Sequence, residues 1–483
     1  MKIMLVSAEV APFAKAGGLG DVSAALPRAL GAEGHDVRIV MPMYAKVHGP
    51  GRHFEVLIPE ITFEMGPHRV RIEVYSAPLP GTTVPVYFVR CPSLYDRPSI
   101  YGNAPDEHLR FGVLNWAALK ICQYLGFAPD ILHCNDWQTC LIPLLVRTVF
   151  AWDALFAHTG TVLTIHNLGH QGTFPAQVAY EVGLGPALSQ VHQDELAAGR
   201  FGFLLTGLLH AHRLTTVSPT YAREIQTPEH GVGLDRVLRA RSDTLHGILN
   251  GIDEQEWDPE ADPHLAQPFS ADHLEGKERC KQVLMQHMGL PYGSNIPVIG
   301  IVSRLVWQKG FDLCMEVLPD LLRHRRVQLC VLGTGEPRFE DFFRRLARAF
   351  PQQVAYQDVF SEPRAHQIEA GADLFLMPSR YEPCGLNQLY SLRYGTAPIV
   401  YNTGGLADSV WQYEPTENRG TGFVFEHFNA SGLTWALLRA LDLWPNRAPW
   451  QAMQRRGMAL PLGWRHRVGQ YIDVYRKAVP HAG

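Results

Sequence analysis

The segment Lys15-Ala16-Gly17-Gly18-Leu19-Gly20-Asp21 joins an apolar run, Ile3 to Val6, to the start of a helix. Apolar residues repeat at helical spacing over residues 22–30, and residues 35–40 resemble the next strand. A glycine-rich turn at a helix N-terminus presents backbone N–H groups and lets a ligand approach the backbone closely. Lys15 adds a positive charge, so the segment predicts a phosphate site, although glycines at such turns often serve only the turn.

The glycine spacing excludes two common phosphate-binding motifs. The glycines stand at positions 17, 18 and 20, which is not the Gly-x-Gly-x-x-Gly pattern of dinucleotide-binding folds. Lys15 precedes the glycines, whereas the lysine of a Walker loop follows them. The segment therefore favours neither NAD binding nor an ATPase.

Short apolar strand candidates alternate with helical patterns along most of the chain, which indicates parallel α/β sheets. Six candidates precede Asn250 and four follow it, at residues 3–6, 37–41, 84–89, 131–133, 161–165, 214–217, 298–302, 327–332, 374–377 and 398–400. Two such series predict an α/β protein with two doubly wound Rossmann-like domains. We expect ligands outside the carboxyl ends of the strands, in a deep cleft that the two domains face.

The junction between the domains is predicted near Leu249-Asn250-Gly251-Ile252-Asp253, followed by a polar stretch over residues 254–270. We place an N-terminal domain at residues 1–248 and a C-terminal domain at residues 249–460. The remaining segment, 461–483, contains a helical pattern over residues 464–477, and we expect it to pack back on the N-terminal domain.

The composition narrows the classes of partner. The 483 residues are 46% hydrophobic and 19% charged, with a net charge of −4 and no long basic run. Nucleic acid and an anionic membrane are therefore not expected as partners. The N-terminal apolar stretch, residues 1–6, is too short for a signal peptide and is expected to be a strand. The eight cysteines are scattered along the chain, which suggests reduced thiols in the cytoplasm. No Cys-x-x-Cys pair supports a metal site, so we expect no metal.

Three further clusters follow predicted strands of the second half. Arg304 and Lys309 lie in Ser303-Arg304-Leu305-Val306-Trp307-Gln308-Lys309-Gly310, where a loop could bring both cations to one diphosphate; solvated surface cations are the plainer alternative. Glu382 precedes a predicted helix start at Gly385, where it could cap the helix or bind sugar hydroxyls. Asn402-Thr403-Gly404-Gly405-Leu406-Ala407-Asp408 repeats the Gly-Gly-Leu string of the opening loop.

In the first half, His133-Cys134-Asn135-Asp136-Trp137 and Thr164-Ile165-His166-Asn167 each end a strand with polar residues. A single histidine is more often structural than catalytic. Two polar clusters at strand ends of one domain make a functional interpretation stronger.

Taken together, these motifs resemble bacterial glycogen synthases and plant starch synthases, which are retaining glycosyltransferases of GT-B architecture. The resemblance covers nearly the whole chain and rests on seven elements in the family's order, at residues 15–21, 135–139, 165–168, 249–253, 303–310, 382–386 and 403–408. It implies transfer of glucose from ADP-glucose to the non-reducing end of an α-1,4-glucan such as glycogen, with retention of configuration. It also implies that the C-terminal domain at residues 249–460 binds the nucleotide sugar. No cofactor, metal or pyridoxal phosphate is expected, and the oligomeric state stays open.

The resemblance also implies roles for individual residues. The expected catalytic residues are His166, Glu382, Lys309, Arg304 and Asp136. The expected substrate-binding residues are Lys15, Gly17, Gly18, Asp21, Asn167, Asn250, Tyr356, Cys384, Gly385, Leu386, Thr403, Gly404 and Gly405. Among them, Lys15, Arg304 and Lys309 match diphosphate-binding cations, and Tyr356 matches a tyrosine of the nucleotide pocket.

Three alternatives stay open at this stage. The chain could be a non-catalytic glucan-binding paralogue, or a related enzyme that uses UDP-glucose or another acceptor. Phosphorylase-type chemistry on a similar architecture would need pyridoxal phosphate, for which the sequence gives no support.

Overall fold

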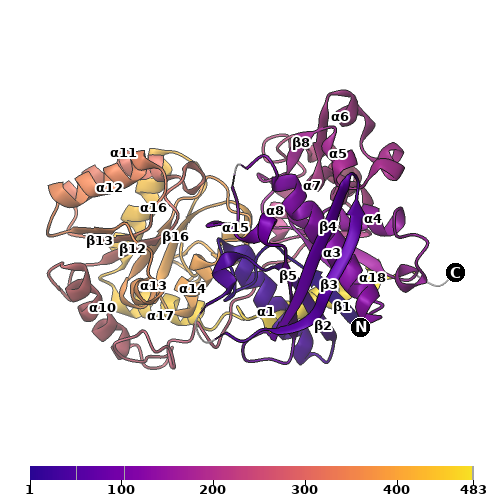
Figure 1. Cartoon of the computed structure of the whole chain (residues 1–483). Helices are drawn as coiled ribbons and strands as arrows, with labels where there is room; N and C mark the ends of the chain where they lie inside the picture. The colour runs from indigo at the N-terminus through magenta and orange to yellow at the C-terminus, as the bar shows by residue number, and fades with distance from the viewer. Residues whose placement is uncertain (50–51, 103, 481–483) are drawn as a thin grey trace. The chain divides into compact units, whose positions relative to one another are not determined.

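A computed structural model of the chain describes residues 1–49, 52–102 and 104–480. The chain divides into two compact units, which Figure 1 shows as the indigo-to-magenta part and the orange part. Unit 1 contains Met1–Asn250 and Arg467–Gly483, and unit 2 contains Gly251–His466. The parallel strand series that the sequence predicts on either side of Asn250 therefore lie in separate units.

Unit 1 is built on a nine-stranded sheet with the order β11-β10-β7-β6-β1-β2-β5-β4-β3. Its strands are β1 (Lys2–Val6), β2 (Asp36–Pro42), β3 (Glu55–Met65), β4 (His68–Pro78), β5 (Pro85–Arg90), β6 (Ile131–Asn135), β7 (Gly160–Ile165), β10 (Arg213–Thr216) and β11 (Leu245–Gly247). A separate two-stranded sheet pairs β8 (Thr173–Pro175) with β9 (Arg200–Gly202). The central strand β1 is buried from Ile3 to Val6, as expected for a strand covered on both faces.

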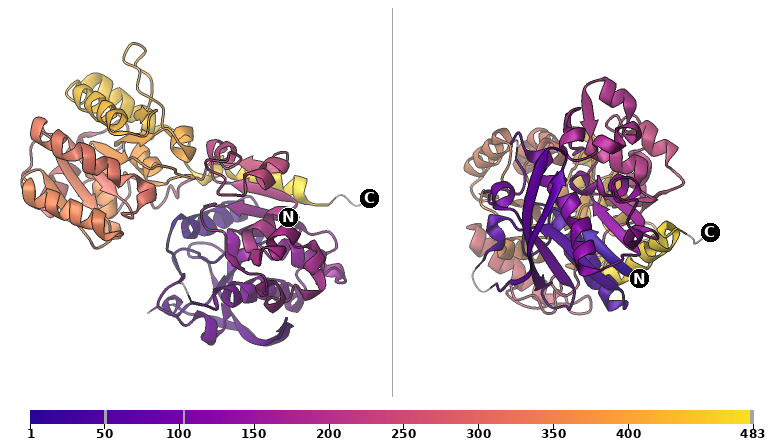
Figure 2. Two further views of the ribbon diagram at one scale, coloured as in Figure 1. Left: turned by 90° about the horizontal axis from the view of Figure 1, so that it is seen from above. Right: turned by 45° about the vertical axis from the view of Figure 1, so that its right-hand side comes forward.

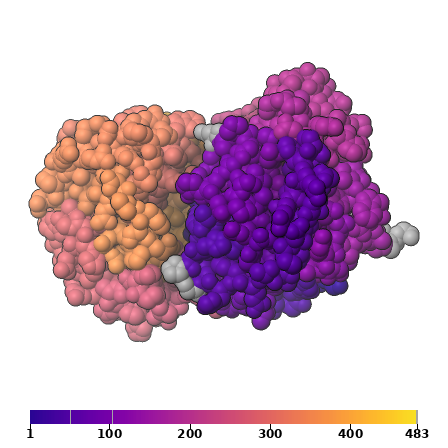
Figure 3. Space-filling view, in the orientation of Figure 1, coloured from indigo at the N-terminus to yellow at the C-terminus, as the bar shows by residue number. Residues whose placement is uncertain are grey.

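Two strands of this sheet depart from the predicted parallel arrangement. β3 and β4 form a long hairpin, and β4 also runs antiparallel to β5. In Figure 3, residues of this early part of the chain, in indigo and purple, cover much of the visible side of unit 1. Buried and exposed residues alternate along β4, the pattern of an antiparallel strand with one solvated face. Neither β3 nor β4 is a continuous apolar run, so the sequence analysis did not predict them.

The helices of unit 1 surround the parallel part of the sheet. They are α1 (Gly18–Ala32), α2 (Pro92–Tyr95), α3 (Glu107–Leu125), α4 (Ile142–Arg147), α5 (Val178–Glu181), α6 (Gln193–Ala197), α7 (Phe203–His210), α8 (Pro219–Glu224), α9 (Asp235–Ala240) and α18 (Val468–Ala478). In the described residues, no helix is long and apolar enough to cross a membrane.

The C-terminal helix α18 belongs to unit 1 although the rest of unit 2 precedes it in the chain. It packs against β7, β10 and α1, and Figure 2 shows it in yellow beside the helices of unit 1. The Tyr475 hydroxyl lies 2.8 Å from His133 Nδ1, a buried contact between α18 and β6. Residues 461–466 differ from the expectation, because Ile252 pairs with Gly463 and keeps this part in unit 2. Residues 481–483 of the expected segment lie outside the described residues.

Unit 2 contains a six-stranded parallel sheet with the order β14-β13-β12-β15-β16-β17. The strands are β12 (Val298–Val302), β13 (Gln328–Leu332), β14 (Val354–Gln357), β15 (Leu374–Met377), β16 (Ala397–Tyr401) and β17 (Phe423–Phe425). The helices are α10 (Glu275–Met288), α11 (Phe311–His324), α12 (Pro337–Ala349), α13 (Glu362–Gly371), α14 (Asn387–Arg393), α15 (Gly404–Ser409), α16 (Ala430–Leu443) and α17 (Arg447–Met458).

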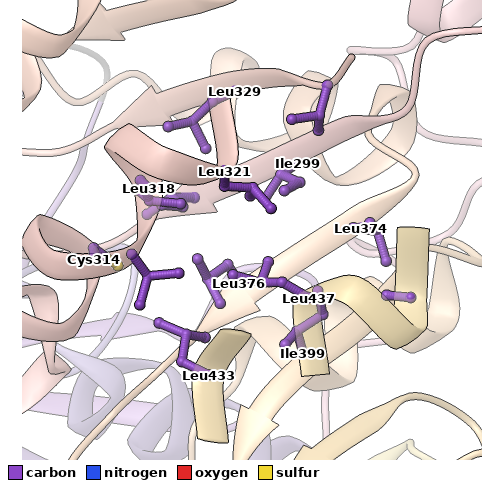
Figure 4. Close-up of a cluster of buried hydrophobic side chains, with 14 of the residues drawn as sticks. Ile299, Cys314, Leu318, Leu321, Leu329, Leu374, Leu376, Ile399, Leu433 and Leu437 are labelled. Atoms are coloured by element: carbon purple, nitrogen blue, oxygen red, sulfur yellow. The ribbon is translucent and has the colours of Figure 1, made fainter. Parts of the chain in front are cut away.

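Alternate residues of each strand point into two different cores of unit 2. Leu329 and Val331 of β13 pack with α11, α12 and α16, the cluster that Figure 4 shows in close-up. Cys330 and Leu332 of the same strand face the opposite core, which α10, α13 and α14 cover. Burial on both faces explains why these strands are continuous apolar runs in the sequence.

Each parallel sheet has a switch point, where neighbouring strands leave in opposite directions. In unit 1 the switch lies at β1, which pairs with both β2 and β6. In unit 2 it lies at β12, which pairs with both β13 and β15. Ligands of doubly wound folds bind at the carboxyl ends of strands beside such a switch. A ligand-binding site is therefore expected at the loops after β1, β6, β12 and β15.

Candidate functional site

The loops after β12 and β15 bring Lys309 and Glu382 into direct contact. Lys309 Nζ lies 2.5 Å from Glu382 Oε2, and Ser379 Oγ donates to the same oxygen at 2.9 Å. Glu382 is 5% exposed, so its charge is held by these two partners rather than by water. The carboxylate receives no hydrogen bond from the first turn of α14, which begins at Asn387. Helix capping, one alternative offered by the sequence, is therefore wrong in this part of the described structure.

The second Gly-Gly-Leu string supports the backbone of Glu382. Gly405 N donates to the Glu382 carbonyl at 3.0 Å. Gly404 has a φ of +44°, and a Cβ at this position would lie 1.9 Å from the Glu382 carbonyl oxygen. Only glycine combines this left-handed conformation with so close an approach. Thr403, the residue before α15, is buried, and the string therefore fixes where the Glu382 loop lies.

The rest of the Glu382 loop is held by α14. Gln388 Nε2 donates to the carbonyls of Cys384 and Gly385 at 3.0 Å each. Cys384 is buried, whereas Gly385 and Leu386 are half-buried. A rigid loop of this kind can present backbone groups to a ligand at defined positions.

Arg304 and Tyr356 lie at the carboxyl ends of β12 and β14. Arg304 is exposed, and among the described residues its guanidinium has no hydrogen-bond or ion-pair partner. The Tyr356 hydroxyl donates to the Gly333 carbonyl at 3.1 Å, and burial raises the pKa of this phenol to about 12. Arg304 is thus a cation open to an anionic ligand, and Tyr356 is a neutral, half-buried ring beside the β13 loop.

In unit 1, the opening glycine loop holds an anion that belongs to the protein itself. The buried carboxylate of Glu9 accepts from the backbone N–H groups of Ala16 at 2.6 Å and Gly17 at 3.0 Å. These two amides are therefore occupied, which differs from the expectation that the turn leaves them open. Lys15 Nζ pairs with Asp21 Oδ1 at 2.7 Å in the first turn of α1, which begins at Gly18.

The loops after β6 and β7 form a second polar cluster in unit 1. Asp136 Oδ1 accepts from the backbone N–H of His166 at 2.7 Å and of Asn167 at 3.4 Å. His166 Nε2 lies 2.9 Å from Asn135 Oδ1, and the Asn135 amide nitrogen donates to the Val6 carbonyl. His166 Nε2 therefore carries the proton, because the Asn135 oxygen accepts. Asp136 has a φ of 53°, a strained value for a residue other than glycine and a frequent mark of functional sites.

The surroundings of this cluster shift its titrating groups towards their neutral forms. Desolvation lowers the pKa of His166 to about 3. Desolvation also raises the pKa of Asp136 to about 7, although hydrogen bonds from the backbone of His166 and Asn167 oppose the change. At neutral pH His166 is thus an uncharged imidazole whose Nδ1 is the acceptor nitrogen.

Asn250 is the last residue of the continuous part of unit 1. Its side chain is 4% exposed, and its Oδ1 is buried without a hydrogen-bond partner among the described residues. An unsatisfied buried acceptor of this kind is uncommon, and a bound donor group is one explanation for it.

The sequence interpretation gave no individual role to Glu9, Asn135 or Ser379, although Asn135 lies in the predicted strand-end cluster at residues 133–137. Glu9 lies three residues after β1, and it also contacts the Tyr101 hydroxyl. Each of the three follows or ends a strand at its carboxyl end, so strand position was the available signal. The sequence alone does not show which of many strand-end polar residues are buried.

Family comparisons divide the chain much as the structure does. The family described as "Starch synthase catalytic domain" matches residues 2–240, and "Glycosyl transferases group 1" matches residues 291–456. Among curated relatives, a glycogen synthase from Anaeromyxobacter sp. is 46% identical over 99% of both chains. A glycogen synthase from Syntrophotalea carbinolica is 44% identical over the same shares.

Solved structures give the same picture. The catalytic domain of starch synthase IV from Arabidopsis thaliana, bound to ADP and acarbose, matches with a TM-score of 0.91. It is 32% identical, and the match covers 99% of each chain. Sucrose-phosphate synthase from Thermosynechococcus elongatus shares the fold, with a TM-score of 0.60 at 18% identity. The expected GT-B architecture is confirmed by these matches.

Proposed function

The chain belongs to the glycogen and starch synthase family of glycosyltransferases, and we propose that it transfers glucose from ADP-glucose to the non-reducing end of an α-1,4-glucan with retention of configuration. The observation that carries the proposal is the buried Lys309–Glu382 pair beside the switch point of unit 2. The pair lies where doubly wound folds bind ligands, which supports a diphosphate-binding role for Lys309 and a sugar-binding role for Glu382. The starch synthase in complex with ADP supports adenine as the nucleotide base.

We assign the diphosphate of the donor to Arg304 and Lys309. The exposed Arg304 guanidinium offers a planar fork for phosphate oxygens, and Lys309 adds a point charge. As the bond between glucose and phosphate breaks, negative charge grows on the leaving phosphate, and fixed cations stabilise that charge. The family resemblance implies that phosphate is also bound by Lys15, Gly17 and Gly18. It implies that Tyr356 lines the nucleotide pocket.

We assign the glucose of the donor to Glu382 and His166. Glu382 Oε2 is held by Lys309 and Ser379, which leaves Oε1 as an acceptor for a sugar hydroxyl. His166 is neutral, and Asn135 fixes its Nε2 proton, so Nδ1 is available to accept from another hydroxyl. Asp136 positions His166 through its backbone N–H. Asn250, with its unsatisfied Oδ1, is a further candidate to bind the reacting sugar.

We propose a same-face route for the chemical step. The bond from glucose C1 to the phosphate oxygen breaks, and the acceptor 4-hydroxyl oxygen forms a new bond to C1 from the same side. The proton of that hydroxyl passes to the departing phosphate oxygen, so charge and atoms balance without a covalent enzyme intermediate. The carboxylates of Glu382 and Asp136 both have partners that fix them in supporting roles. Trapping of a covalent glucosyl-enzyme would overturn this route.

The reaction as proposed needs no metal and no pyridoxal phosphate. The eight cysteines are all unpaired, which supports a reducing compartment such as the cytoplasm as its location. Nucleotide release is the direct test, measured with ADP-glucose and with UDP-glucose, each with and without glycogen. Glycogen-dependent release of ADP, faster than that of UDP, is the expected result. Glycogen-dependent release of UDP but not of ADP would show that UDP-glucose is the donor. No nucleotide release from either donor would favour a non-catalytic glucan-binding protein.

A further inference from the structure

A cluster in unit 2, outside the residues assigned to the reaction, has the composition of a metal site. It contains Glu256, Glu362 and His366, each of which can place one ligand atom within 4.8 Å of the other two. Glu362 and His366 are one turn apart at the start of α13, while Glu256 comes from the segment that opens unit 2. The sequence did not predict this group, because Glu256 lies far along the chain from Glu362 and His366.

His366 is held as metal-binding histidines are held. It is 2% exposed, and its Nδ1 lies 2.7 Å from Oδ2 of Asp262, a carboxylate that also accepts from the Tyr394 hydroxyl at 2.6 Å. Asp262 therefore lies behind His366 as a carboxylate lies behind a metal-bound histidine.

The ring plane of His366 is fixed as well. The Trp257 ring stacks on it at a centroid distance of 3.8 Å and an angle of 10°. The opposite face of Trp257 stacks on Tyr390 at 3.7 Å. The imidazole therefore cannot turn Nε2 away from the two glutamates without breaking both the stack and the bond to Asp262.

Nε2 of His366 has no hydrogen bond among the described residues. The nearest carboxylate oxygen is Glu362 Oε1 at 4.0 Å, beyond hydrogen-bond distance. A metal ion between these two atoms would give both of them a partner.

We propose that Glu256, Glu362 and His366 bind one divalent transition-metal ion, with Asp262 as the supporting carboxylate. One imidazole nitrogen and two carboxylate oxygens suit Zn²⁺, with Mn²⁺ weaker and Ca²⁺ weakest, because Ca²⁺ prefers oxygen ligands alone. Three protein ligands leave a position for water. The ion would join the segment that opens unit 2 to α13, and its role is structural. The inference does not rest on the proposed function.

Isothermal titration calorimetry on the full chain, after removal of tags and dialysis against a chelator, tests the site. Zn²⁺, Mn²⁺ and Ca²⁺ are each titrated separately. We expect one strong Zn²⁺ site per chain, weaker Mn²⁺ binding and the weakest Ca²⁺ binding. Glu256→Gln and Glu362→Gln should each weaken Zn²⁺ binding by about tenfold or more. Glu316→Gln, an exposed carboxylate of α11, is the matched control and should bind as the unchanged chain does.

Thermal unfolding gives a second readout that does not depend on activity. Added Zn²⁺ should raise the Tm of the unchanged chain and of Glu316→Gln, and should leave the Tm of Glu362→Gln unmoved, because only a folded site binds the ion. His366→Gln is used only if circular dichroism shows it folded, and it should then behave as Glu362→Gln does. Equal Zn²⁺ affinity in all variants, no strong site, or equal Ca²⁺ and Zn²⁺ affinity would overturn the proposal.

Discussion

Lys309 and Glu382, which lie 73 residues apart in the chain, form a direct ion pair across the switch point of unit 2. The pair is largely buried, with side-chain exposures of 18% and 7%. Removing one partner from a buried pair leaves the other charge without compensation, which costs about 3–5 kcal/mol. The two residues are therefore coupled in stability as well as in the proposed chemistry.

Lys309→Ala should lower both turnover and stability. The loss of a cation that stabilises the leaving phosphate is expected to cost about 2–4 kcal/mol of transition-state stabilisation. The uncompensated Glu382 carboxylate should also reduce the free energy of unfolding. In the double variant Lys309→Ala/Glu382→Ala, part of that stability should return. Denaturant unfolding and steady-state rates of Lys309→Ala, Glu382→Ala and the double variant check this, and additive stability losses would show that the pair is not coupled.

Arg304→Ala separates catalysis from stability. Because the Arg304 guanidinium has no partner among the described residues, its removal should leave the free energy of unfolding within about 0.5 kcal/mol of the unchanged chain. Turnover should still fall by about 2–4 kcal/mol in activation free energy. Arg326→Ala, another exposed arginine of unit 2, is the control. Similar rates in the two variants would remove Arg304 from the diphosphate site.

Two glycines should respond differently to alanine. A Cβ on Gly17 would meet no atom within 4 Å, so Gly17→Ala should fold normally and yet weaken donor binding if a phosphate approaches this backbone. A Cβ on Gly404 would lie 1.9 Å from the Glu382 carbonyl oxygen, so Gly404→Ala should lose stability and activity together. Gly469→Ala in α18, which also meets open space, is the control. Normal donor KM in Gly17→Ala would refute the close approach at that loop.

The contact between His133 and Tyr475 predicts a dependence of stability on pH. Burial lowers the pKa of His133 to about 3, whereas an unfolded histidine titrates near 6.5. Between these values the unfolded chain binds a proton that the folded chain does not, so stability falls as the pH falls. The contribution is about 1.4 kcal/mol per pH unit.

His133→Gln should remove this contribution and flatten the fall in unfolding free energy between about pH 6.5 and pH 4. The exposed His158→Gln is the control and should keep the slope of the unchanged chain. Denaturant unfolding at several pH values gives the slopes. An unchanged slope in His133→Gln would mean that the buried imidazole is protonated in the folded state.

Much of the fold can be predicted from the sequence because the parallel strands are buried on both faces. All ten predicted strands exist, and two of them, Val298–Val302 and Leu374–Met377, have the predicted limits. The hairpin of β3 and β4 was missed because strands with one solvated face alternate polar and apolar residues, as Glu55–Met65 does near its end. β17, with three residues, is too short to stand out from its surroundings.

That Lys309, Glu382, Asp136 and His166 lie near strand ends also follows from the sequence, because each lies in the segment that follows an apolar run. The hydrogen-bond and ion-pair partners of these residues cannot be predicted from the sequence. That Glu9 occupies the amides of Ala16 and Gly17 depends on how the loop after β1 folds back, which no local pattern encodes. The same holds for Asp262 behind His366, where residues far apart in the chain meet.

The central claim is glucosyl transfer from a nucleotide sugar to an α-1,4-glucan, and incorporation of labelled glucose into glycogen tests it most directly. With ADP-glucose labelled in the glucose, the unchanged chain should extend glycogen and release one ADP for each glucose incorporated, and an α-1,4-specific glucosidase should remove the label. The account would be contradicted if the folded chain incorporated no glucose into glycogen from either ADP-glucose or UDP-glucose.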